Sequence, residues 1–199
     1  MIIVRTEEME PLTQPSVVCL GFFDGVHLGH RALLRAAGEI GEKDGLTLCV
    51  HTFDRSPAGV THPGARQMAL TTNGEKEALL ESFGCQVLAY SVFSDAMRRM
   101  SGRAFFEEIL LEKLRAKAIV AGYDHRFGFM GGTDVAGLQA LCGEHGVALR
   151  VVPKVTLPGG EVISSTAVRQ ALLKGDIPLA EAMLGRKISE EWIRALKRA

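Results

Sequence analysis

Short apolar runs alternate along this chain with segments in which apolar residues recur at helical spacing. Five of the runs are rich in β-branched or aromatic residues and end close to glycine, aspartate or proline, which is typical of strands. They cover residues 17–23, 47–53, 86–93, 117–123 and 148–155. Helical patterns cover residues 29–43, 73–83, 102–116 and 134–145. This alternation predicts an α/β fold in which helices cover both faces of a mostly parallel sheet.

Capping residues support these helices. Ser101 and Thr133 precede the third and fourth helices, where a hydroxyl can cap free N–H groups, and Gly84 and Gly146 follow two helices, where glycine ends a helix without strain. With right-handed crossovers, the strands form a doubly wound, Rossmann-like sheet of five strands.

The last part of the chain changes character. Helical patterns over residues 164–174 and 178–184 follow the last strand, and a final amphipathic pattern runs from Ser189 through Trp192 to Lys197. We therefore expect one domain over residues 1–186 and a helical extension over residues 187–199.

Composition narrows the classes of protein. A length of 199 residues with 47% hydrophobic residues suits one domain with a full core, and 23 basic residues balance 23 acidic ones, so no overall field attracts nucleic acid or a membrane surface. The cysteines are scattered, and the first residues lack a signal-peptide layout. We expect a cytoplasmic protein with no membrane or nucleic-acid partner; the oligomeric state stays open.

Residues 21–30 read Gly-Phe-Phe-Asp-Gly-Val-His-Leu-Gly-His and join a predicted strand to a predicted helix. Glycines allow close approach to the backbone, a helix N-terminus favours anions, and histidines add N–H donors, so the turn predicts a phosphate site. Two alternatives are structural histidines and a zinc site, and the latter lacks further ligands in a C-x-x-C or H-E-x-x-H pattern.

Polar residues also follow the later strands. Residues 122–128 read Gly-Tyr-Asp-His-Arg-Phe-Gly, in which Asp124 can accept hydrogen bonds from a ribose or ring and Arg126 can bind a phosphate. The alternative is an internal Asp124–Arg126 ion pair that shapes the loop, and the two roles are compatible. Residues 163–169 read Ile-Ser-Ser-Thr-Ala-Val-Arg, which offers more hydroxyls than a helix cap needs. Residues 52–57 read Thr-Phe-Asp-Arg-Ser-Pro, whose phenylalanine and proline can flank a flat ring.

The turn resembles the H-x-G-H signature of the nucleotidyltransferase superfamily. The four motifs in this order, over residues 15–186, are similar to the FMN adenylyltransferase module of the bacterial bifunctional riboflavin kinase/FAD synthetase family. The resemblance implies the H-x-G-H nucleotidyltransferase fold and the transfer of AMP from ATP to FMN, which gives FAD and pyrophosphate with Mg²⁺.

The resemblance also implies roles for residues of the motifs. Catalytic roles fall to His27, His30 and Asp124. ATP binding falls to Gly21, Phe22, Asp24, Gly29, Ser164, Ser165, Thr166 and Arg169. Flavin binding falls to Phe53, Arg55, Pro57, Asp124, Arg126 and Phe127. It assigns no metal ligand.

Two departures from the family pattern affect these expectations. Arg55 stands where the family's T-F-x-P-x-P motif has its first proline, which makes flavin recognition less secure than nucleotidyl transfer; Arg55 either meets an acceptor phosphate or is a solvated loop residue. Only thirteen residues follow Arg186, where the family continues into a kinase barrel, so we expect no riboflavin kinase activity. Transfer to another phosphorylated acceptor and a flavin- or nucleotide-binding regulator remain the alternatives.

Overall fold

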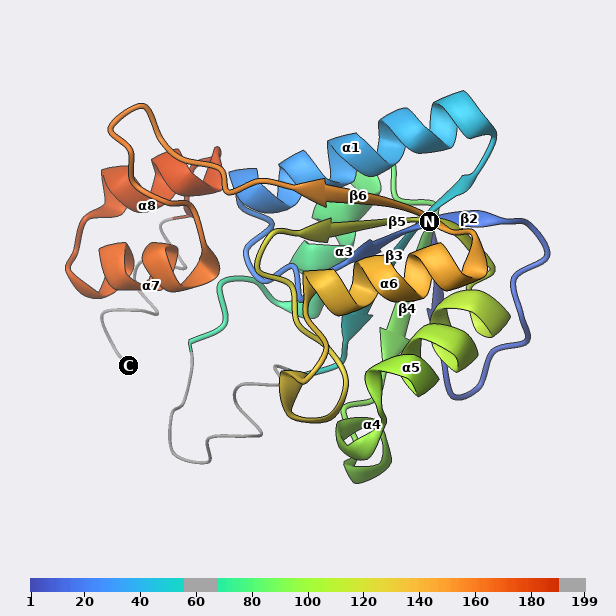
Figure 1. Ribbon diagram of the computed structural model, residues 1–199. Coiled ribbons are helices and arrows are strands. Elements are labelled where there is room, and N and C mark those ends of the chain that lie inside the picture. The colour runs from blue at the N-terminus through green and yellow to red at the C-terminus, as the bar shows by residue number, and fades with distance from the viewer. Residues whose placement is uncertain (56–67, 190–199) are drawn as a thin grey trace.

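The protein is an α/β/α sandwich in the computed structural model, which describes residues 1–55 and 68–189 (Figure 1). Six strands form the central sheet: β1 (Ile2–Arg5), β2 (Ser16–Leu20), β3 (Thr47–Phe53), β4 (Val87–Ser91), β5 (Ala116–Gly122) and β6 (Ala148–Val152). The helices are α1 (Leu28–Asp44), α3 (Asn73–Ser82), α4 (Asp95–Arg99), α5 (Gly102–Ala104), the π-helix η1 (Phe105–Lys113), the 3₁₀-helix η2 (Phe129–Gly131), α6 (Val135–His145), α7 (Ser165–Leu173) and α8 (Ile177–Leu184).

The strand order is β1-β4-β3-β2-β5-β6, and every pairing is parallel. This confirms the doubly wound α/β class but adds one strand to the five that the sequence predicts. Strand β1 has four residues at the edge of the sheet, with Ile2 and Ile3 64% and 49% exposed, and pairs with β4 in the register Ile2–Val87. So short an edge strand shows no periodic pattern of its own.

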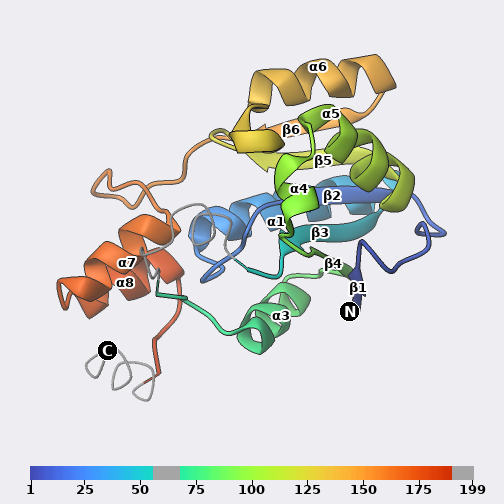
Figure 2. The same ribbon diagram turned by 90° about the horizontal axis from the view of Figure 1, so that it is seen from below.

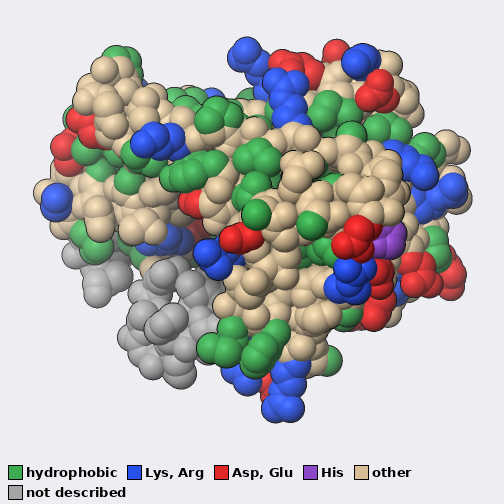
Figure 3. Space-filling model, in the orientation of Figure 1, with side chains coloured by type: hydrophobic (Ala, Val, Ile, Leu, Met, Phe, Trp, Pro, Cys, Tyr) green, Lys and Arg blue, Asp and Glu red, His purple; other side chains and the backbone are tan. Residues whose placement is uncertain are grey.

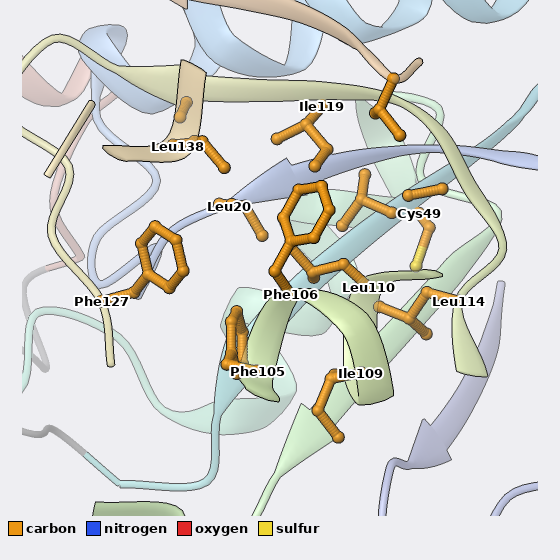
Figure 4. Packing of buried hydrophobic residues seen from close by; sticks show 14 of the residues in the cluster. Leu20, Cys49, Phe105, Phe106, Ile109, Leu110, Leu114, Ile119, Phe127 and Leu138 are labelled. Carbon is orange, nitrogen blue, oxygen red and sulfur yellow. The ribbon is translucent and has the colours of Figure 1, made fainter. Parts of the chain in front are cut away.

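Alternate residues of each buried strand point to opposite faces of the sheet and build two hydrophobic clusters. On one face, Val17, Cys19 and Val50 pack with residues of α1 and α3. On the other, Val18 and Cys49 pack with residues of η1 and α6, as Figure 4 shows around Phe106. The view from below in Figure 2 shows α6 next to β6 and α3 next to β4, toward opposite ends of the strand order.

Local capping explains the helix boundaries. Ser101 caps α5 as predicted, but α6 begins one residue later than predicted, because Asp134 rather than Thr133 accepts the N–H of Gly137 at 3.0 Å. The predicted helix 102–116 is a short α-helical turn followed by the π-helix η1. Of the predicted extension over residues 187–199, only residues 187–189 are among the described residues. The predicted flavin residue Pro57 also lies outside them.

Helices α7 and α8 pack against each other and against Leu70 in a third, smaller cluster. They lie beyond the carboxyl edge of the sheet, next to the start of α1 (Figure 1). No helix in the described part of the chain is long and apolar enough to span a bilayer.

Candidate active site

The strand order reverses between β2 and β5: the chain leaves β2 toward β3 on one side, while β5 leads to β6 on the other. At such a switch point, loops diverge at the carboxyl ends of the strands and leave a crevice for a ligand. Residues 21–30 follow β2 and residues 123–133 follow β5, so the two loops richest in candidate residues flank the switch point. The fold therefore places them where open α/β sheets bind ligands.

The turn after β2 has an unusual backbone. Phe23, Gly25 and Val26 have φ of 57°, 83° and 40°, and a β-branched residue such as valine rarely adopts a positive φ. Surrounding groups hold the turn: the Gly25 N–H donates to the Thr71 hydroxyl at 3.1 Å, and Arg186 donates to the Gly25 carbonyl at 2.6 Å. Strain of this kind persists only where contacts fix it, and it concentrates at functional sites.

His27 and His30 lie together at the start of α1. His27 caps the helix, because its Nδ1 accepts the His30 N–H at 3.2 Å, which leaves the proton of the neutral ring on Nε2. The two rings stack with centroids 3.7 Å apart. Burial lowers the pKa of His27 to about 4 and that of His30 well below its usual range, so both rings are neutral at pH 7.

The free N–H groups of the first helical turn lie beside these rings. His30 Nδ1 is buried and has no hydrogen-bond partner within the described ranges. Gly29 leaves room for the His27 ring, since a Cβ there would lie 3.1 Å from it. Neutral imidazole donors and a helix N-terminus together form a place suited to an anion.

Asp24 is buried within the protein rather than open to the crevice. Its carboxylate accepts the N–H of Leu70 at 2.9 Å and that of Thr71 at 3.2 Å, and it forms an ion pair with Arg169 of α7. Arg169 also donates to the Met68 carbonyl at 2.7 Å. These bonds join the turn, α7 and residues 68–71, three segments that are distant in sequence.

The hydroxyls at the start of α7 have separate partners. Ser164 caps the helix by accepting the Ala167 N–H at 3.1 Å, and Ser165 donates to the Asp24 carbonyl at 2.9 Å. Thr166 is exposed, and its hydroxyl has no partner in the part of the chain that the structure describes. Of the three predicted hydroxyl donors, Ser165 already donates within the protein, whereas in the described residues the O–H groups of Ser164 and Thr166 remain free to donate, and Thr166 is the more exposed of the two.

The loop after β5 is shaped by a close backbone approach. Gly128 has φ of 75°, and a Cβ there would lie 2.5 Å from the Gly102 nitrogen. Arg126 donates to the Gly131 carbonyl at 3.2 Å, and within the described residues it forms no ion pair with the exposed Asp124. The Asp124 carboxylate therefore stays available to a ligand.

Six aromatic rings form a continuous row between the ends of β3 and β5, which we call the ring row. Neighbouring centroids lie 5.1–5.8 Å apart. Its members, in spatial order, are Phe93, Phe53, His51, Phe105, Phe127 and His125. The row brings together two predicted flavin residues, Phe53 and Phe127, from separate motifs. The exposed Arg55 lies beside it, 3.4 Å from Asp54.

Lys76 of α3 belongs to the site, although its sequence context resembles an ordinary helix surface. The residue is only 3% exposed, and its ammonium lies 5.0 Å from the centroid of Phe22 and 5.2 Å from that of Tyr90. Burial lowers its pKa, while Asp24, Glu77 and Asp54 act in the opposite direction. It has no ion pair within residues 1–55 and 68–189. An unpaired buried cation beside the turn is a candidate phosphate ligand.

Comparison with known proteins gives consistent results. The model of the FAD synthetase family matches residues 9–167. The bifunctional riboflavin kinase/FMN adenylyltransferase of Bacillus subtilis (strain 168) is 36% identical over 86% of this chain and 54% of the relative. That of Escherichia coli (strain K12) is 35% identical over 85% of this chain and 54% of the relative. The chain spans little more than half the length of these curated relatives.

Solved structures resemble the fold. A structure described as a macrolide-efflux protein from Streptococcus pneumoniae has a TM-score of 0.83 and 31% identity, over 94% of this chain and 60% of that one. The pantoate-β-alanine ligase of Francisella tularensis has a TM-score of 0.58 over 100% of this chain and 85% of that one; at 14% identity it supports the fold alone. With the family model covering most of its length, the chain belongs to the FAD synthetase family.

Proposed function

We propose that this chain transfers the adenylyl group of ATP to FMN. The observation that supports this most directly is the position of the histidine turn and the ring row at one edge of the sheet. A phosphate oxygen of FMN bonds to the α-phosphorus of ATP, and the bond from that phosphorus to the bridging oxygen of the β-phosphate breaks. FAD and pyrophosphate result, and no covalent enzyme intermediate is required.

In this proposal, the residues position two anions and offset their repulsion. His27 and His30 donate N–H groups to ATP phosphates, with the amides of Leu28 and Gly29 beside them. Thr166 donates its hydroxyl to the same nucleotide. Asp124 contacts substrate from the opposite loop, Phe53 flanks the flavin, and the buried Phe127 supports that aromatic surface from behind.

Mg²⁺ fits this site as an ion carried mainly by the nucleotide. Within the described ranges, no three His, Cys, Asp or Glu side chains are grouped to hold a metal ion. Mg²⁺ commonly binds through substrate phosphates, waters and one or two carboxylates. Asp24 is engaged by Arg169, so the exposed Asp124 is the better-placed carboxylate. The ion would neutralise charge that develops on the phosphates.

We also propose that the protein acts in the cytoplasm without nucleic-acid or membrane partners. Its basic and acidic residues balance, with 23 of each. On the face drawn in Figure 3, side chains of both signs are interspersed rather than gathered by charge. Such a surface offers no extended positive field for polyanions.

Incubating the full chain with ATP, Mg²⁺ and FMN tests the proposed reaction. We expect FAD, measured by chromatography, and pyrophosphate, measured by a coupled assay, in equal amounts. If pyrophosphate is released only when another phosphorylated acceptor is supplied, that acceptor, and not FMN, is the substrate. Tight flavin binding without turnover would instead make the protein a regulator and overturn the proposal.

Replacing Lys76 by methionine is expected to lower kcat/KM about 10- to 100-fold, the loss typical of a hydrogen bond to a charged group. Methionine keeps the apolar stem of the side chain and removes the buried ammonium, which has no ion pair in the described residues. The melting temperature should therefore stay level or rise. FAD formation and thermal unfolding measure the two effects. Lys43→Met, an exposed change in the last turn of α1, is the control. Unchanged kinetics for Lys76→Met would exclude phosphate binding by this residue.

A further inference from the structure

A second pair of histidines, His51 and His125, lies in the ring row, apart from the pair on the turn. His51 is 2% exposed on β3, and His125 belongs to the loop after β5. The two are close enough to influence each other's charge, and burial lowers the pKa of His51 to about 3 and that of His125 to about 4. Both are therefore neutral at pH 7, and each offers one N–H donor and one acceptor.

The two rings differ in their hydrogen bonds. His51 Nε2 lies 2.8 Å from the Ser91 hydroxyl, which lies 2.7 Å from the Thr6 hydroxyl, so a buried polar chain across β3, β4 and the end of β1 fixes the ring. His125 stacks on Phe127 with centroids 5.8 Å apart. Its Nε2 is buried and has no hydrogen-bond partner within the described residues. A buried polar atom without a partner is costly, which favours a partner supplied by a ligand or water.

The surroundings of His125 indicate the kind of partner. Phe53, Phe93 and His125 are the partly exposed members of the ring row, while Phe105 and Phe127 are 4% and 8% exposed behind them. Aromatic faces favour a flat conjugated ring. A neutral imidazole at one end of such a surface can hydrogen bond to the polar edge of that ring. The isoalloxazine of FMN has this form, with an apolar benzenoid end and a pyrimidine edge of alternating donors and acceptors.

We propose that His125 is a specificity-determining residue for the acceptor, whose ring edge supplies the missing hydrogen bond to His125 Nε2. His51 is a positioning residue: held by Ser91, it packs on Phe53 and Phe105 and keeps this end of the ring row in place. This inference rests on the proposed transfer to FMN and deepens it, because it names the group that distinguishes one flat acceptor from another.

The variant His125→Phe tests the proposal, since it keeps the stacking on Phe127 and removes both ring nitrogens. We expect the Kd for FMN, measured by quenching of FMN fluorescence, to rise about five- to tenfold, with KM for ATP unchanged. His125→Gln, which keeps a donor and an acceptor, should recover part of the affinity. His145→Phe is the control, because His145 of α6 also packs on a phenylalanine, with its ring tilted against that of Phe106 at a centroid distance of 5.4 Å.

Flavin analogues show whether the nitrogen contacts the ring edge. Two analogues are compared with FMN: 5-deaza-FMN, which lacks the N5 acceptor, and 3-methyl-FMN, which lacks the N3 donor. The unaltered chain should bind at least one of them about fivefold less tightly than FMN. His125→Phe should abolish that difference. Equal FMN affinity in the folded His125→Phe variant, or discrimination that survives in it, overturns the proposal. Failure of the unaltered chain to form FAD would overturn the proposed function instead, and the binding measurements would still test His125.

Discussion

The variant His30→Ala is expected to form FAD with a kcat/KM about 10²- to 10³-fold below that of the unaltered chain, the usual loss when one preorganised donor to a reacting group is removed. His30 forms no side-chain hydrogen bond within the described part of the protein, so its removal should leave the fold intact. Steady-state kinetics with FMN and ATP, together with circular dichroism, measure both expectations.

His30 is a sharper test than His27. The His27 ring caps α1, so His27→Ala removes a helix cap, worth about 1 kcal/mol, as well as a candidate donor. His145→Ala, at an exposed histidine that ends α6, controls for the loss of an imidazole away from the candidate site. If the folded His30→Ala variant forms FAD at nearly the normal rate, His30 has no catalytic role.

Features that depend on neighbouring residues could be predicted from the sequence. The apolar runs predict five of the six strands, and the hydroxyls of Ser101 and Ser164 cap helices where expected. These signals are local: a strand needs its own apolar pattern, and a cap needs one oxygen near a free N–H. Strand β1 is not predicted, because its four residues are stabilised as a strand by pairing with β4 and have no local pattern of their own.

Features that depend on distant contacts could not be predicted. Lys76 occupies a helix that reads as an ordinary charged surface, and only tertiary packing places its ammonium between Phe22 and Tyr90. The ring row joins His51 and His125, whose positions in the sequence give no sign that they meet. A histidine in an apolar run and another beside an arginine are each compatible with many environments.

Asp24 shows how the structure sharpens a residue assignment. The resemblance implies that Asp24 contacts ATP. In the structure, the Asp24 carboxylate instead pairs with Arg169 and accepts the N–H groups of Leu70 and Thr71. The two roles predict different measurements. A ligand contact would change KM for ATP and leave stability unchanged, while a buried structural anchor would change the free energy of unfolding first.

We expect Asp24→Ala to lower the free energy of unfolding by about 3–5 kcal/mol, because it leaves the Arg169 guanidinium, 14% exposed, without its anion. Urea unfolding measures the loss, and the exposed Asp44→Ala, which should change stability by less than about 0.5 kcal/mol, is the control. Adding Arg169→Met to Asp24→Ala should restore part of the stability, since the unpaired charge is removed with its partner. If Asp24→Ala is as stable as the unaltered chain, the pair is not a structural anchor, and Arg169 is then available for the phosphate contact that the sequence implies. The expected loss would instead mean that Asp24 and Arg169 are a structural anchor that holds the strained turn, which carries His27 and His30, in place.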